Sequence, residues 1–172
     1  MSNIIKAIQE IYPDIEGGFV YWETKQDGTP LDNPEDGLIW ENIEYSKPLW
    51  SNVEAKLNEV DLQEAKDAKT TEIEQARKDY QYSNITFEGN DYLATFTAQT
   101  KFYNLLSLST GDIDWRLADC VTWITLTQTQ AIALKDVIIA RESAAYQHES
   151  TKIIDINNAI DVEAVNAIDW TL

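Results

Sequence analysis

The stretch from Ser51 to Tyr82 constrains the fold most, because it predicts one long helix with little apolar surface. It is rich in Ala, Glu, Lys and Gln, which favour helices. Ser51 is the expected N-cap, and Glu54, three residues later, would complete a capping box. A helix of about thirty residues would be about 45 Å long.

The apolar side chains of this predicted helix are too few to bury much surface by themselves. They are Val53, Leu57, Val60, Ala65, Ala68, Ile73, Ala76 and Tyr80, and only some keep a consistent seam. Two interpretations stay open. The helix is a solvated connector between two modules, which we favour, or it forms a coiled-coil homo-oligomer through residues 51–82.

Before this helix, the sequence predicts a small module of one helix and two strands. Residues 3–12 space apolar side chains at helical intervals, and Pro13 ends the helix. The runs Phe19–Thr24 and Leu38–Tyr45 predict strands, joined by a polar loop at residues 26–37. Because a lone hairpin is only marginally stable, we expect it to pack on the helix or on a partner.

After the long helix, the chain predicts a hairpin and then a helix. Gly89-Asn90 supplies the positive φ that a tight hairpin turn needs. Residues 95–108 predict a helix that is capped by Thr95 or Thr97 and ended by Gly111.

A further strand and a last long helix are predicted from Val121 onwards. Val121–Leu126 alternates as a strand does, with Trp115 and Trp123 expected to pack beside the turn that precedes it. Thr127 is the expected N-cap of a helix that begins near Gln128. The side chains expected in its core face are Ile132, Leu134, Val137, Ile138 and Ala145.

Residues 150–172 interleave aliphatic and acidic side chains, which predicts an acidic amphipathic tail. The tail either continues the preceding helix or folds back as a short helix. It packs on its own module or binds a partner in the helix-in-groove manner.

These elements together predict an α+β fold in three parts. The parts are a helix-plus-hairpin module at 1–48, a connecting helix at 49–82, and a mostly helical module with a short hairpin or small sheet at 83–172.

The charge balance limits the class of partner. Thirteen basic against thirty acidic residues give a formal net charge of −17. This charge opposes binding to nucleic acid or to anionic membranes. It either is simply the acidic surface of a soluble protein, which we favour, or attracts a basic partner. No apolar run reaches the roughly 18–20 residues of a membrane span, and the first residues do not resemble a secretory signal. We therefore expect a cytoplasmic protein.

The residue types of catalytic and metal sites are scarce. The one cysteine, Cys120, is expected to be a small buried side chain, and the one histidine, His148, a solvated one. The acidic runs at 32–36 and 111–114 are expected to be solvated or to close turns. Without a triad, a phosphate loop or a zinc pattern, we expect no catalytic residue, no metal, no cofactor and no enzymatic activity.

Exposed aromatic and aliphatic side chains are the remaining candidates for a site, because such groups anchor protein interfaces. Both faces of a thin N-terminal sheet cannot be buried by one short helix. The candidate partner-binding residues are Tyr21, Trp22, Trp40 and Tyr45 on the strands, with Ile160, Val165, Ile168 and Trp170 in the tail.

One stretch also resembles a known domain. Its features are a helix ending Ile73-Glu-Gln-Ala-Arg77, the hairpin Ile85–Gly89, a helix start at Thr97–Gln99, Trp115, and Val121–Thr127 leading into a helix. Through these features, residues 69–141 resemble an uncharacterised domain that recurs in bacteriophage tail-fibre and tail-assembly proteins. Ser83-Asn84 stands where that domain usually has a glycine. The opening helix ending in Tyr12-Pro13, followed by a Trp-bearing strand, looks like the start of small proteins encoded beside phage tail-fibre genes.

The resemblance implies a role in phage tails. One form is a chaperone-like protein that binds a tail or fibre protein in the host cytoplasm during assembly. The alternative is a structural component of the tail or fibre that stays in the virion. A third interpretation, independent of the resemblance, is an acidic module that inhibits a host protein.

Overall fold

The computed structural model describes residues 3–25 and 28–172. Helices and short antiparallel strand pairs alternate along the chain, which confirms the predicted α+β class. The chain divides into two compact units, Met1–Ala68 with Ile160–Asn166, and Lys69–Ala159 with Ala167–Leu172. The division falls inside the long helix α2, Trp50–Tyr82. Gln26 and Asp27, part of the expected loop, lie outside the described residues.

The first unit contains α1 (Asn3–Ile11), β1 (Phe19–Tyr21), the short 3-10 helix η1 (Pro34–Gly37), β2 (Leu38–Trp40) and α5 (Val162–Asn166), with the first part of α2. Strands β1 and β2 pair antiparallel, with Phe19 opposite Trp40 and Tyr21 opposite Leu38. The prediction that the second strand reaches Tyr45 is wrong. The chain turns after Trp40, because Asn42 Oδ1 accepts hydrogen bonds from the N–H groups of Glu44 and Tyr45.

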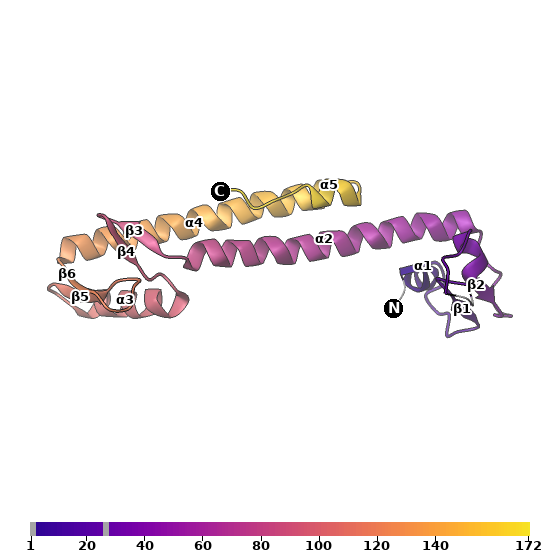
Figure 1. Ribbon diagram of the computed structural model, residues 1–172, viewed down its shortest axis with the longest axis horizontal. Helices are drawn as coiled ribbons and strands as arrows, with labels where there is room; N and C mark the ends of the chain where they lie inside the picture. Colours follow the sequence, from indigo (N-terminus) through magenta and orange to yellow (C-terminus); the bar gives the residue numbers. More distant parts are fainter. Residues whose placement is uncertain (1–2, 26–27) are drawn as a thin grey trace. The chain divides into compact units, whose positions relative to one another are not determined.

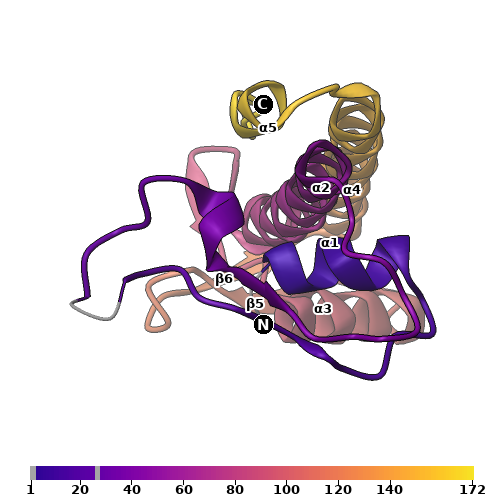
Figure 2. The ribbon, with the colours of Figure 1, turned by 90° about the vertical axis from the view of Figure 1, so that its right-hand side faces the viewer.

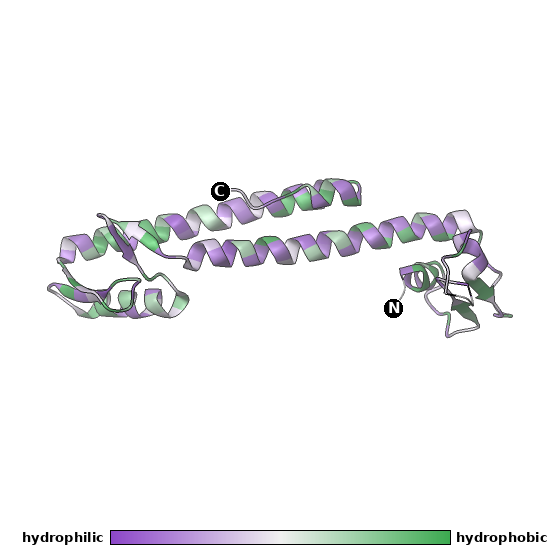
Figure 3. Ribbon diagram, in the orientation of Figure 1, coloured by the Kyte–Doolittle hydropathy of each residue, from purple (hydrophilic) through white to green (hydrophobic). Residues whose placement is uncertain are grey.

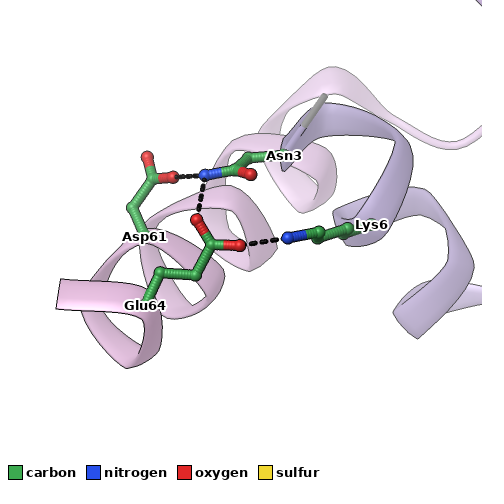
Figure 4. Close-up of polar contacts among 4 residues, drawn as sticks. All are labelled: Asn3, Lys6, Asp61 and Glu64. Atoms are coloured by element: carbon green, nitrogen blue, oxygen red, sulfur yellow. Dashed lines mark hydrogen bonds and ion pairs between the residues drawn. The ribbon is translucent and has the colours of Figure 1, made fainter. Parts of the chain in front are cut away.

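Helix α1 is attached to α2 by an apolar face and a polar edge. Ile4 and Ile8 pack with Leu38 and Val53 in the core of this unit. Figure 2 shows α1 beside the start of α2. At the edge, the Asn3 side chain donates to Asp61 Oδ1 at 2.6 Å and to Glu64 Oε2 at 2.9 Å (Figure 4).

Lys6 completes this polar edge by pairing with the other oxygen of the same carboxylate, Glu64 Oε1 (Figure 4). The Lys6 and Asn3 hydrogen bonds lower the pKa of Glu64. The ionised carboxylate therefore favours the docked position of α1.

The second unit contains the end of α2, β3 (Ile85–Phe87), β4 (Asn90–Tyr92), α3 (Phe96–Leu108), β5 (Ile113–Arg116), β6 (Trp123–Leu126) and α4 (Gln128–Asn158). Both strand pairs, β3–β4 and β5–β6, are antiparallel. Helix α3 packs beside the beginning of α4 (Figure 1).

Helix α4 extends well into the predicted acidic tail before it ends. The chain leaves the helix at Ala159, and the short α5 follows, with the Asp161 side chain accepting the N–H of Ala164 at 2.7 Å. The tail therefore does both things that were expected, because it continues the helix and then forms a short one.

The helix caps agree with the sequence in two of three places. The Thr95 side chain caps α3, and Thr127 forms a capping box with Gln130 at the start of α4. The prediction for α2 is wrong, because the helix already begins at Trp50 and the Leu49 carbonyl accepts the N–H groups of the first turn. Ser51 is therefore a helical residue.

Two turns differ from their predictions. In the β3–β4 hairpin the positive φ values belong to Glu88 (48°) and Gly89 (78°), one residue earlier than expected. Helix α3 ends at Leu108 with Ser109 as its C-cap, before Gly111.

Strand β6 begins two residues later than predicted because a side chain organises the preceding turn. Asp119 Oδ1 accepts from the N–H groups of Val121 and Thr122, both at 2.9 Å, and holds them in the turn. Cys120, in the same turn, is exposed at a φ of 59°, so the prediction that it is buried is wrong. Trp123 is also 64% exposed, whereas Trp115 packs against Phe102 as predicted.

The core of the second unit lies where the two hairpins meet α3 and α4. It consists of Ile85, Tyr92, Ala94, Phe102, Ile113, Leu126, Ala131, Leu134 and Ile138. Of the α4 side chains predicted to face the core, Ile132 and Val137 are instead 41% and 38% exposed. Hydrophilic and hydrophobic residues alternate along both long helices, α2 and α4 (Figure 3).

Leu134→Ala is expected to lower the free energy of unfolding by about 2–5 kcal/mol, because it opens a cavity at a fully buried position. Urea denaturation followed by circular dichroism measures the change. Leu108→Ala is the matched control, because Leu108 is 84% exposed, and its effect should stay within about 0.5 kcal/mol. Equal effects of the two variants would contradict the packing described here.

Glu64→Gln is expected to lower the melting temperature at neutral pH and to have less effect as the solution is acidified. The folded-state pKa of Glu64 is lowered, so its contribution is complete above the unfolded-state pKa and is lost as pH falls through the folded-state pKa. Melting curves from pH 7 to about 3 test this expectation. The control is Glu54→Gln, at an exposed carboxylate on the same helix, and its effect on the melting temperature at neutral pH should be small.

Candidate interaction surfaces

The aromatic side chains predicted as N-terminal anchors are mostly engaged with one another. The Trp40 ring stacks on Phe19 with 5.6 Å between centroids, and its Nε1 donates to the Tyr45 carbonyl at 2.9 Å. Tyr12 lies against both Trp40 and Tyr45, at 5.9 and 5.1 Å. Trp40 and Tyr45 therefore contribute to the packing of the first unit.

The other two N-terminal candidates differ in exposure. Tyr21 is half-buried against the core of the unit, and burial, together with the charge of Glu23, raises its pKa. Trp22 is 59% exposed, so it is the member of the set whose ring is open to a partner.

The candidate residues of the tail separate in the same way. Val165 is fully buried, whereas Ile160 is 84% exposed. Ile168 is half-buried. Trp170 meets the ring of His148 edge-on at 4.6 Å and lies 6.4 Å from the Tyr80 ring. His148 is consequently half-buried rather than solvated, and Ile160 is the open tail residue.

Polar side chains that the sequence did not single out join α2 to α4 inside the second unit. Arg77 is 8% exposed and Gln81 2%. Arg77 Nε donates to Glu149 at 3.1 Å and its Nη1 to Gln81 Oε1 at 2.6 Å. Gln81 in turn donates to Glu142 Oε1 at 2.8 Å. The buried side chains of Arg77 and Gln81 thus donate to acceptors on the facing helix or one turn along their own, as buried polar groups require.

Two further contacts extend this network. The Arg77 guanidinium lies 4.6 Å from the Tyr146 ring centroid. The buried Gln99 side chain donates to the Gln81 carbonyl at 3.3 Å and to the Ala94 carbonyl at 2.9 Å, which attaches α3 to the end of α2.

Arg141, which lies on α4, holds the chain segment that follows α2. Its guanidinium lies 4.5 Å from the Tyr80 ring centroid, and Nη1 donates to the carbonyls of Ser83 and Asn84, both at 3.0 Å. The residues between α2 and β3 are therefore held by a cation from a helix distant in sequence.

An open groove of about 490 Å³ lies between α3 and α4. It is lined by Tyr103, Leu106, Ser107, Gln128, Ile132, Lys135, Ile139 and Glu142. The hydroxyl of Tyr103 and Oε1 of Gln128 are buried and lack a hydrogen-bond partner within the part of the chain that the structure describes. The sequence does not predict this groove, because it places Ile132 in the core. The four- and three-residue spacing of 128, 132, 135, 139 and 142 is the signal that marks a second face of α4.

The chemistry of the described residues is limited. Across residues 3–25 and 28–172, no group of three or more His, Cys, Asp or Glu side chains is arranged to hold a metal ion. Within the same ranges, no helix is both long and apolar enough to cross a bilayer. Asp119, the carboxylate with several partners in a loop, has its pKa lowered by the Thr122 hydroxyl and the backbone N–H groups of its own turn.

The class defined by this geometry is an α+β protein with exposed apolar and aromatic side chains. The sequence pattern of the family described as Domain of unknown function (DUF4376) matches residues 64–171, which is more than half of the 172 residues. The chain belongs to this family. No curated protein and no solved structure matches the chain.

Arg77→Met is expected to lower the free energy of unfolding by about 3–5 kcal/mol, because it leaves Glu149 and Gln81 without their buried partner. Urea denaturation measures the loss. Lys78→Met is the control, because Lys78 is exposed on the next position of the same helix and should change stability by less than about 0.5 kcal/mol. A loss no larger than that of Lys78→Met would show that the network is dispensable.

Proposed function

We propose that the protein is a non-enzymatic assembly protein of bacteriophage tails, which binds a tail or tail-fibre protein in a chaperone-like manner in the host cytoplasm. The observation that carries this proposal is the resemblance of residues 69–141 to a domain that recurs in phage tail-fibre and tail-assembly proteins. The matched family is described only as a domain of unknown function, so it neither adds to the proposal nor opposes it.

Exposed apolar side chains support a binding role. Trp22 and Ile160 are 59% and 84% exposed, and exposed groups of this size are typical anchors of protein interfaces. The net charge of −17 favours a partner with a basic surface and disfavours nucleic acid. Such a partner suits a protein that covers the apolar or basic surface of a tail component before that component is assembled.

Two other roles are outcomes of the test. A structural subunit of the tail or fibre is compatible with the same resemblance, and an acidic inhibitor of a host protein is compatible with the same charge. They differ from the assembly role in where the protein is found after the virion is complete and in what it binds.

The experiment is affinity capture of the tagged protein from cells that produce the phage, followed by mass spectrometry of the captured proteins and of purified virions. A chaperone-like role predicts a tail or fibre protein in the captured fraction and the absence of this chain from virions. Stoichiometric recovery from virions would support the structural role instead, and capture of host proteins alone would support the inhibitor.

Trp22→Ala is expected to reduce recovery of the tail protein at least about tenfold. A tryptophan that becomes buried by the partner contributes about 2 kcal/mol or more to an interface. Trp123→Ala is the matched control, since Trp123 is similarly exposed, at 64%, but was not predicted as an anchor. Equal recovery with both variants would remove Trp22 from the binding surface.

A further inference from the structure

The groove between α3 and α4 has the features of an incomplete interface. Ile132 and Ile139 are 41% and 48% exposed, although they lie beside the half-buried Leu106. At the same place, the Tyr103 hydroxyl and Gln128 Oε1 are withdrawn from solvent without a partner among the described residues. A second surface that covers the groove would remove the aliphatic groups from water, and it relieves the unpaired polar atoms where it supplies them with hydrogen-bond partners.

The charges of the groove indicate which surface fits. Lys135 and Glu142 both line it, on the same face of α4 and about 10 Å apart along the axis, with Ile139 between them. A uniformly basic partner would be repelled by Lys135, and a uniformly acidic one by Glu142. A partner helix that runs antiparallel and carries the same order of charges would pair an acid with Lys135 and a base with Glu142.

A second copy of this chain meets that requirement without any further assumption. Two α4 helices related by a two-fold axis run antiparallel when the axis is perpendicular to them. If the axis passes close to Ile139, Lys135 of each copy faces Glu142 of the other. An interface of this kind must be self-complementary. The order Lys135, Ile139, Glu142 is self-complementary when the two helices run antiparallel.

We propose that the α3–α4 groove binds the same groove of a second copy, with the two α4 helices antiparallel and Ile139 at the centre. Leu106 and Ile132 of each copy then lose their contact with water. This surface differs from the 51–82 helix, through which the sequence allowed a coiled-coil oligomer.

The present contacts of Lys135 and Glu142 leave each side chain able to form a further ion pair. Lys135 Nζ lies 3.4 Å from Asp136, the next residue on its own helix, where both side chains are partly exposed. Glu142 accepts from Gln81 through Oε1, and a carboxylate has further acceptor capacity on its second oxygen.

The net charge of −17 opposes association of two copies at long range. At physiological ionic strength the screening length is about 8 Å, so the charges at the groove act locally while the rest of the acidic surface is screened. Dimerisation is therefore expected to strengthen as salt is raised from low concentration.

Sedimentation velocity of the full chain over a concentration series at physiological salt tests the proposal. The wild type is expected to show a reversible monomer–dimer equilibrium. In the proposed dimer, Lys135→Glu places an acid opposite Glu142 of the other copy at both ends of the interface. Ile139→Ser removes the apolar contact at its centre. Each is expected to weaken dimerisation at least about tenfold. Ile154→Ser, at a 57% exposed position of α4 outside the groove, is the matched control and should leave it unchanged.

Charge exchange gives the sharpest arm of this experiment. Lys135→Glu and Glu142→Lys should each dimerise poorly alone, whereas an equimolar mixture of the two should form a heterodimer and the double variant should regain the homodimer. Circular dichroism checks that each variant is folded. If Glu142→Lys does not fold, because it loses its bond to Gln81, then Lys135→Glu and Ile139→Ser decide the matter.

A wild type that remains monomeric at every concentration would overturn the proposal, as would a dimer that neither Lys135→Glu nor Ile139→Ser weakens. Binding of an unrelated apolar helical peptide to a monomeric chain would show a different occupant and would also overturn it. The proposed phage role is independent of this result, because it depends on capture of a tail protein and on Trp22.

Discussion

The ion pair and hydrogen bonds that join Arg77 and Gln81 to Glu149 and Glu142 are the contact on which the second unit depends. The partners run in opposite order along the two helices, so they fix α2 and α4 as antiparallel and set their register. Buried charge pairs contribute little net stability but strongly penalise alternatives in which one member is unpaired. If α2 slid by one turn, these polar groups would be buried without partners, so they oppose the shift. An aliphatic seam alone would not oppose it.

This constraint explains how a helix with so little apolar surface can be part of a folded unit. Helix α2 buries only a few aliphatic side chains, including Val53, Val60 and Ile73. Its specificity comes from polar groups that are satisfied across the interface: Arg77 and Gln81 in the second unit, and Asp61 and Glu64 against α1 in the first. The acidic character of the chain is thus partly structural, because several carboxylates accept buried or half-buried donors.

Local elements could be read from the sequence, whereas the use of their faces could not. Thr95 and Thr127 indicate helix starts because capping acts within one turn. Trp115 packs against Phe102, although the sequence does not predict the strand β5 that carries it. Strand ends were overestimated because the Asn42 and Asp119 side chains capture backbone N–H groups that β propensity ignores. The sequence places Ile132 in the core, although it is 41% exposed, because a helix with two apolar faces gives no local sign of which face is covered. The structural role of Arg77 has no local sign in the sequence, because its acidic partner Glu149 lies 72 residues away.

The turn between β5 and β6 has a practical consequence for any study of this molecule. Cys120 is the one cysteine of the sequence, and it is exposed in a turn that the Asp119 carboxylate holds in place. It is therefore a single attachment point for a fluorophore or a spin label, at a position whose backbone is well ordered by hydrogen bonds. The same thiol can cross-link two chains in air, so a covalent dimer would mimic self-association unless a reductant or a Cys120→Ser variant is used.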